Sequence, residues 1–276
     1  MNCLFFKYNI NGNIIVLVQK NEKLVSNYQK FSKRILDPVF GVGGDGLIVY
    51  DNDIFKIDYF NQDGSKALFC GNGLRAYVDY LSYHKPSFNG TYPVLFGNHV
   101  YTNFLNRSDK TISTIIPLDY VDLRIPSYYN DFSTNVILPI RIKLLEKELE
   151  IYPIKIGVLH LVVINNTKEL NNHYLNEEKL EVLKEDLKNR FIEEFNITII
   201  RINNNQVKEF TFYERGVGYT LNCGSGTLCG AYILYLKGLL KNNRLCLNDD
   251  LVVEITSKEL IITGVSKLLC WGKYNE

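Results

Sequence analysis

The chain has 276 residues, of which 46% are hydrophobic, and its 31 Lys and Arg residues balance 30 Asp and Glu residues. This length is compatible with one large domain or two of ordinary size, and the hydrophobic content is enough for a substantial core. The net charge of +1, without any run of five like charges, excludes a nucleic-acid arm or acidic tail. We therefore expect a small-molecule partner and no nucleic acid.

The start of the chain lacks the basic and apolar regions of a signal peptide, and no stretch approaches 18 uninterrupted apolar residues. These features predict a cytoplasmic protein without a membrane partner. The six cysteines are expected as free thiols, because a chain of this length without a secretion signal rarely depends on disulfides. The sequence contains no C-x-x-C pair and its four histidines form no ligand-spaced cluster, so no metal is expected.

Short segments with alternating or β-branched residues predict a series of strands along the chain. They cover residues 13–19, 46–51, 55–60, 92–96, 111–117, 161–165, 197–202, 209–214, 251–256 and 259–264.

Four helices are predicted between these strands. Residues 21–35 and 176–193 have the pattern of amphipathic surface helices, whereas 71–84 and 224–239 are apolar and rich in small residues, as in a buried helix. Each buried helix has strands before and after it, which indicates an internal duplication. The predicted fold is α+β, with two lobes joined near residues 117–120, each with strands wrapped round a central helix.

Both predicted buried helices begin with the same residue pattern, a cysteine followed by glycine, a polar residue and glycine, in "FCGNGLR" and "NCGSGTLCG". A helix start has unpaired N–H groups and a positive dipole end, so it can bind a carboxylate and stabilise a thiolate. The glycines allow a carboxylate to approach the main chain closely. One such cysteine would more often be a small buried residue, but the matched settings of Cys70 and Cys223 favour a pair of acid–base groups.

Three other stretches contain polar candidates. GVGGDG satisfies G-x-G-x-x-G, but a strand follows it where a dinucleotide fingerprint requires a helix, so we interpret it as a turn. Asn13 and Asn61 lie in turn-like segments, and could be turn formers or ligand-binding amides. Glu214 and Arg215 end a strand ahead of Cys223, while His160 lies in an apolar segment typical of a satisfied core histidine.

The motifs FKYNINGNIIVLV, GVGGDGLI, FNQDGSKALFCGNGLR, IGVLHLVV and YERGVGYTLNCGSGTLCGA together resemble those of the diaminopimelate epimerase family. This resemblance implies two pseudo-symmetric lobes, with the active site in the cleft between them. It places residues 1–118 and 265–276 in a first lobe that carries Cys70, and residues 119–264 in a second lobe that carries Cys223. It also implies an enzyme without a cofactor, in lysine and peptidoglycan precursor biosynthesis, and allows a homodimer.

For the chemistry, the resemblance implies epimerisation of LL-diaminopimelate to the meso form by two bases, Cys70 and Cys223, one acting as thiolate and the other as thiol. His160 matches a family histidine close to the first thiol, and Glu214 would bind the distal amine or assist Cys223. The reacting carboxylate would be held by the backbone of Gly71, Asn72, Gly224 and Ser225. The distal part of the substrate would contact Asn13, Asn61, Asn196, Glu214 and Arg215.

The sequence departs from the family pattern near the distal end of the expected substrate. Val158 replaces an asparagine, Leu159 a proline, Tyr219 an acidic residue and Ile14 an aspartate, while Lys66 stands where glutamate is common. These changes leave open a racemase or epimerase of another amino acid, such as histidine or lanthionine, on the same scaffold. A relative that only binds ligand is the third alternative, and the presence of both cysteines argues against it.

Overall fold

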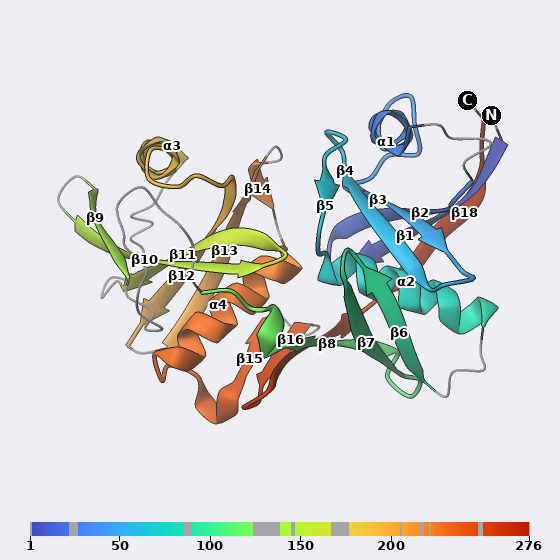
Figure 1. The fold of residues 1–276 in the computed structure, drawn as a ribbon. Helices are drawn as coiled ribbons and strands as arrows, with labels where there is room; N and C mark the ends of the chain where they lie inside the picture. Colours follow the sequence, from blue (N-terminus) through green and yellow to red (C-terminus); the bar gives the residue numbers. More distant parts are fainter. Residues whose placement is uncertain are drawn as a thin grey trace. The chain divides into compact units, whose positions relative to one another are not determined.

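The computed structural model describes residues 2–21, 27–85, 90–123, 139–144, 147–166, 177–204, 206–215, 218–220, 222–247 and 251–275. Two compact units are formed, one by residues 1–118 with 244–276 and the other by residues 119–243 (Figure 1). The fold is α+β, as predicted, and most strand pairs within the sheets are antiparallel.

A 12-stranded sheet forms the first unit. In sheet order its strands are β15 (Arg244–Leu247), β16 (Leu251–Ile255), β17 (Glu259–Val265), β8 (Thr111–Pro117), β7 (His99–Asn106), β6 (Thr91–Phe96), β4 (Lys56–Asn61), β3 (Gly46–Asp51), β2 (Asn13–Gln19), β1 (Asn2–Ile10) and β18 (Lys267–Asn275), with β5 (Lys66–Ala67) paired to β4.

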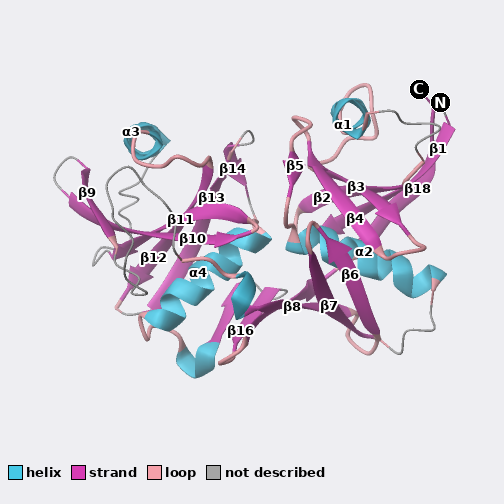
Figure 2. Ribbon diagram, viewed as in Figure 1, coloured by secondary structure: helices cyan, strands magenta, loops and turns pink. Residues whose placement is uncertain are grey.

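Helices cover both faces of the β2 and β3 region, which explains why these two strands are continuous apolar runs. Val16 and Leu47 pack with Phe31 of α1 (Tyr28–Ile35) on one face. On the other face, the ring of Tyr50 packs at a tilt against that of Tyr77 in α2 (Gly71–His84), with centroids 5.5 Å apart. The two helices lie on opposite sides of these strands in Figure 2. Helix α2 is therefore the buried helix that the sequence predicts.

The boundary between the units differs from the expected one for residues 244–264. The resemblance implies that this segment belongs to the second lobe, but the structure groups it with the first unit. The reason is a long-range strand pairing, in which β17 lies antiparallel to β8, with Leu260 opposite Ile116. The short helix η1 (Leu118–Tyr120) follows β8, at the position where the sequence predicts the connection.

The second unit contains a six-stranded sheet with a helix on each face. Its strands, in sheet order, are β14 (Gly218–Thr220), β13 (Gln206–Glu214), β12 (Phe195–Asn203), β11 (Val158–Asn166), β10 (Lys147–Ile156) and β9 (Ile140–Leu144). Leu183 of α3 (Glu177–Lys188) packs with Leu161 and Ile199 on one face. Helix α4 (Gly224–Leu236) packs on β10, β11 and β12 and is followed by η2 (Lys241–Asn243).

All four predicted helices are present, although their ends differ. Helix α1 begins at Tyr28, and residues 22–26 of the expected segment lie outside the described residues. Helix α4 ends at Leu236, where Lys237 closes the last turn. Among the described residues, no helix has the length and apolar character needed to cross a membrane.

Candidate active site

Cys70 is the N-cap of α2. Its backbone is extended (φ −152°, ψ 104°), and its Sγ accepts a hydrogen bond from the Gly73 N–H at 3.3 Å. Gly73 lets this turn pack closely on the sheet, since a Cβ would lie 3.1 Å from Ile48 and 3.2 Å from Tyr59. The sulfur therefore satisfies one of the N–H groups that a helix start leaves without an intrahelical partner, as a serine cap would.

Cys223 occupies the same position at the start of α4. Its backbone is also extended (φ −127°, ψ 108°), and its Sγ accepts a hydrogen bond from the Gly226 N–H at 3.4 Å. A Cβ on Gly226 would lie 2.8 Å from both Phe212 and Thr198, so glycine allows the first turn to pack directly on the sheet. The shared residue pattern of the two cysteine segments thus corresponds to the same local structure at the start of both helices.

The Cys223 thiol donates a hydrogen bond to a carboxylate. Its Sγ lies 3.3 Å from Glu214 Oε2, and Thr220 donates to the other oxygen of Glu214 at 2.6 Å. Cys223 is buried, and this burial, followed by the negative charge of Glu214, raises the pKa of its thiol well above the usual value. The arrangement keeps Cys223 protonated.

His160 is linked to Cys223 through Ser225. Its Nε2 lies 2.9 Å from Ser225 Oγ, which in turn lies 3.4 Å from Cys223 Sγ. Thr198 Oγ1 contacts Nδ1 at 3.1 Å, so both ring nitrogens are satisfied. Burial lowers the pKa of His160 to about 3, so the ring is neutral at physiological pH. The resemblance places this histidine close to the first thiol; in the structure it belongs to the unit of Cys223.

Cys70 has a different electrostatic setting. Arg75, one turn further along α2, is fully buried and donates a hydrogen bond from Nη2 to Asn72 Oδ1. Burial lowers the pKa of Arg75 to about 10, and the interaction with Cys70 acts in the opposite direction. A cation therefore accompanies Cys70, whereas a carboxylate accompanies Cys223.

The first unit also holds two of the expected substrate-binding asparagines. Asn13 begins β2, and its Oδ1 is buried without a hydrogen-bond partner among the described residues. Asn61 ends β4, and its Nδ2 donates to Ser65 Oγ at 2.9 Å. Asn61 is therefore part of a turn, as its sequence context suggested, while the Asn13 oxygen is available for a ligand donor.

Asn196 and Arg215 meet in the second unit. Asn196 Oδ1 accepts a hydrogen bond from the Arg215 N–H at 2.9 Å, and Asn196 is paired with His160 in the β11–β12 register. The Arg215 guanidinium forms an ion pair with Glu194. Strand alternation places Tyr213 and Glu214 on opposite faces, so Glu214 faces α4.

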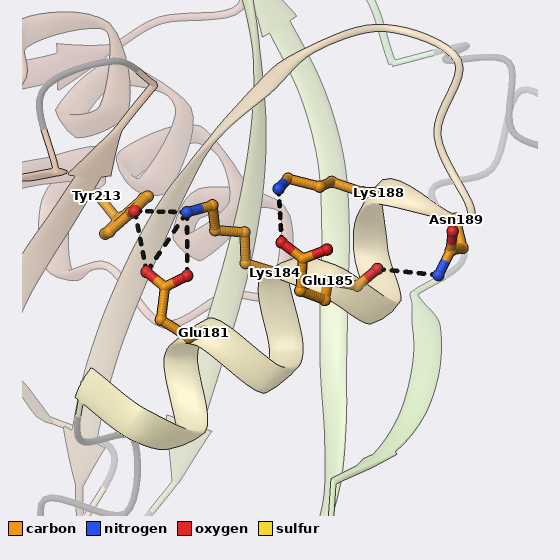
Figure 3. Close-up of polar contacts among 6 residues, drawn as sticks. All are labelled: Glu181, Lys184, Glu185, Lys188, Asn189 and Tyr213. Carbon is orange, nitrogen blue, oxygen red and sulfur yellow. Dashed lines mark hydrogen bonds and ion pairs between the residues drawn. The ribbon is translucent and has the colours of Figure 1, made fainter.

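Arg215 also lines a cavity of about 390 Å³ on the α3 side of the sheet, with Lys184, Lys188 and Tyr213 among the lining residues. Figure 3 shows the polar contacts beside it: Lys184 Nζ donates to Tyr213 Oη at 2.7 Å, and Tyr213 donates to Glu181 at 3.0 Å. The cations here already have acidic partners. The structure therefore brings Glu214, Ser225 and His160 to Cys223, but turns the Arg215 side chain toward α3 and Glu194.

Three residues with polar roles at these helix starts were missed in the sequence analysis: Arg75, Thr198 and Thr220. Arg75 lies within the quoted cysteine segment, and Thr220 precedes Cys223 by three residues. Thr198 has no local signal, because its contact with His160 depends on the parallel pairing of β11 and β12, in which Thr198 lies two residues beyond the partner of His160.

Comparisons with known proteins agree with this architecture. The family model for diaminopimelate epimerase matches residues 5–97. A diaminopimelate epimerase from Clostridium perfringens is 24% identical, covering 98% of both chains, and one from Methanococcus aeolicus is 27% identical, covering 99% of both. A solved hydroxyproline epimerase from Agrobacterium vitis superposes with a TM-score of 0.65 at 11% identity, covering 99% of this chain and 92% of that one.

The family model and the curated relatives indicate an isomerase of the epimerase class, and the solved structure shows that the fold is shared. Within this class, the resemblance to the diaminopimelate epimerase family is confirmed by the family model and by relatives that match over nearly the full length of the chain.

Proposed function

We propose that the protein epimerises LL-diaminopimelate to meso-diaminopimelate by a two-base mechanism, with Cys70 and Cys223 as the bases, and thereby serves lysine and peptidoglycan precursor synthesis. The observation that carries the proposal is that two helices each have a cysteine as N-cap. In both, the cysteine sulfur accepts a hydrogen bond from the backbone N–H of the residue three positions later. A cysteine with a purely structural role does not need to lie at a helix start with its sulfur hydrogen-bonded to a backbone N–H. The occurrence of this arrangement in both units suits a reaction in which one group acts on each face of the same carbon.

In this mechanism one thiolate removes the α-proton while the other thiol delivers a proton to the opposite face. One C–H and one S–H bond break, and one S–H and one C–H bond form, so the protonation states of the two cysteines exchange. The mechanism requires both sulfur atoms to reach the same α-carbon.

The helix starts would also bind the substrate carboxylate. The N–H groups of Gly71 and Asn72 in α2, and of Gly224 and Ser225 in α4, belong to the turns that leave donors outside the helical ladder. Donors aimed at this carboxylate stabilise the negative charge that it gains as the α-proton leaves.

Glu214 and His160 would act through Cys223. Glu214 accepts the thiol hydrogen bond and favours the protonated cysteine, so we assign it the role of holding the proton that Cys223 delivers. Neutral His160 fixes Ser225 Oγ, which contacts the sulfur. Both residues would thus set the proton position at Cys223.

Asn13, Asn61, Asn196 and Arg215 are proposed to bind the distal end of the substrate. The orphaned Asn13 oxygen supports this role, because a substrate ammonium group would satisfy it. Arg215 would have to leave Glu194 to bind a distal carboxylate.

That requirement supports a second candidate, racemisation or epimerisation of an amino acid with a less polar side chain, among them histidine and lanthionine. Arg215 is engaged by Glu194, and apolar Val158 and half-exposed Tyr219 stand at positions where the family is polar. The hydroxyproline epimerase with this fold acts on an amino acid without a second ammonium group.

Incubation with a panel of amino acids in deuterated water separates the candidates. We expect exchange of the α-proton of LL-diaminopimelate, read by proton NMR, under reducing conditions. Exchange of another amino acid alone would establish the second candidate, and no exchange at all would indicate a ligand-binding protein.

The two-base assignment is tested by Cys70→Ala and Cys223→Ala. Each variant should lose epimerisation by several orders of magnitude, because neither face can then complete the proton transfer. Cys246→Ala is the matched control, since Cys246 is exposed on β15 and should be replaceable. Normal turnover in either of the first two variants contradicts the assignment.

A further inference from the structure

Within the part of the chain that the structure describes, Arg75 is a fully buried cation that no carboxylate accompanies. Its Nη2 donates to Asn72, but its Nε and Nη1 have no hydrogen-bond partner among the described residues. A buried charge that is neither paired nor fully hydrogen-bonded is costly, so such groups normally accompany an anion. The unsatisfied guanidinium therefore points to an anionic group close to the start of α2.

The Arg75 side chain reaches back along the helix toward Cys70. A Cβ on Gly71 would lie 3.7 Å from Nη1, and one on Gly264 of β17 would lie 3.2 Å from Nε. The guanidinium thus lies between the first turn of α2 and β17, as expected for a helical side chain that leans toward the N-terminus. This position is beside the residue that directly follows Cys70.

The other ionisable groups around α2 have partners of their own. Asp79 accepts a hydrogen bond from Ser266, at 3.0 Å, and acts electrostatically on Tyr8, while Asp51 acts on Tyr77. The strands packed on α2 present buried groups that are neutral, among them Tyr50 on β3, Asn103 on β7 and Thr114 on β8. The electrostatic interaction that offsets the burial of Arg75 comes from Cys70.

We infer that Arg75 is a positioning residue that stabilises Cys70 as the thiolate of the resting protein. The helix dipole and the guanidinium act in the same direction at this sulfur, whereas the carboxylate of Glu214 acts on Cys223 in the opposite direction. The two cysteines are therefore unequal before substrate arrives: Cys70 accepts a proton first and Cys223 donates one. Only this catalytic consequence rests on the proposed function.

The test is alkylation of the ligand-free full chain with iodoacetamide between pH 5 and 10, with each cysteine followed by peptide mass spectrometry. Thiolates react and thiols do not, so the rate against pH reports ionisation at each site. In the wild type, Cys70 should react faster than exposed Cys246 at pH 6.5, although Cys70 is half-buried. Slower reaction of Cys70 across the whole pH range overturns the inference and needs no variant.

Arg75→Met removes the cation, and Arg75→Lys keeps it. We expect the pH midpoint of Cys70 alkylation to rise by about one unit in Arg75→Met, which corresponds to roughly tenfold slower reaction at pH 6.5, with most of the rate retained in Arg75→Lys. The rate at Cys246 should stay the same in all three proteins. An unchanged Cys70 midpoint in folded Arg75→Met also overturns the inference, and if that variant does not fold, the wild-type comparison decides.

These readouts are independent of turnover. Selective alkylation of Cys70 that depends on Arg75, in a protein that exchanges no amino-acid α-proton, would leave the inference standing and remove the proposed function. The reverse result is exchange of an amino-acid α-proton by a protein in which Arg75 has no effect on Cys70 alkylation. It would support the proposed function and overturn the inference about Arg75.

Discussion

Glu214 and Arg75 place opposite charges beside two cysteines whose backbone settings are the same. The carboxylate contacts one sulfur directly, and the guanidinium lies against the helix turn that begins with the other. Neither charge follows from the glycine and cysteine spacing that identifies the helix starts. At the scale of the residue, one local structure therefore places two thiols in opposite electrostatic surroundings.

Replacement of Glu214 by Gln should make Cys223 easier to ionise. The carboxylate raises the pKa of the thiol, so its removal lowers that pKa and increases the thiolate fraction at any pH below it. We expect alkylation of Cys223 at pH 8 to accelerate by roughly tenfold, the effect of a shift of one pKa unit. Glu209→Gln on the same strand, where Glu209 pairs with Arg201, is the control. A slower reaction in Glu214→Gln would contradict the assignment.

His160 makes stability depend on pH. Its pKa is lowered to about 3 by burial, against 6.5 when exposed, so the unfolded chain binds a proton that the folded protein excludes. This contribution to stability is present above pH 6.5 and is lost as pH falls toward 3. Between pH 7 and pH 5 it amounts to as much as about 2 kcal/mol.

The measurement is urea unfolding of the second unit at both pH values, followed by circular dichroism because the single tryptophan, Trp271, lies in the first unit. His160→Gln should reduce the loss of stability on acidification, whatever its effect at pH 7. His99→Gln, at an exposed position on β7, should leave that loss unchanged. Equal pH dependence in wild type and His160→Gln would count against a buried neutral histidine.

At the scale of the element, the sulfur of each cysteine caps a helix in addition to its proposed role as a base. Cys70→Ser keeps a side-chain acceptor for the Gly73 N–H, whereas Cys70→Ala removes it. Loss of an N-cap costs about 0.5–2 kcal/mol, and a sulfur cap should lie at the low end. We expect Cys70→Ser to unfold at the wild-type urea concentration and Cys70→Ala to be less stable.

Both variants should be inactive, because serine is far too weakly acidic to replace the thiol. Cys70→Ser is thus expected to keep the stability of the wild type while it loses activity. If Cys70→Ser were as unstable as Cys70→Ala, the cap would contribute nothing to α2.

The elements that could be predicted from the sequence are those whose burial follows a local pattern. Strands β3 and β8 occur with the predicted bounds, because every residue of the first up to Tyr50 is buried and the second alternates. Strand β18 was missed because its residues are mostly exposed, so no alternation is visible. Strand β10 was missed because Pro153 interrupts its run of strand-forming residues. In the structure, Pro153 nevertheless lies within the strand, directly opposite Leu161 of β11.

For the site, the helix starts and both cysteines followed from the sequence, but the surroundings of each sulfur did not. The contact of Glu214 with Cys223 requires β13 to end beside the start of α4, and the contact of Thr198 with His160 requires the parallel β11–β12 register. Such long-range pairings are not encoded in the spacing of neighbouring residues. For the same reason, residues 244–264 were placed in the wrong unit.

At the scale of the whole molecule, the second unit is one continuous segment inserted into the first. Residues 119–243 have their own sheet and their own core, so we expect a fragment of these residues to fold alone. Residues 1–118 alone should not fold, because they lack β17 beside β8 and β18 beside β1. Proton–nitrogen NMR spectra of the two fragments provide the measurement, and dispersed signals from residues 1–118 alone would contradict the prediction.

The pairing of β1 with β18 brings Asn2 opposite Asn275, so the two ends of the chain meet on neighbouring strands (Figure 1). A linker of about two to five residues, the length of a hairpin loop, would join them. New ends could then be opened between Asn243 and Arg244, in an exposed stretch after α4. In this circularly permuted chain the first unit would be continuous and complete before the second is synthesised, so the order of folding on the ribosome would become a quantity that can be engineered.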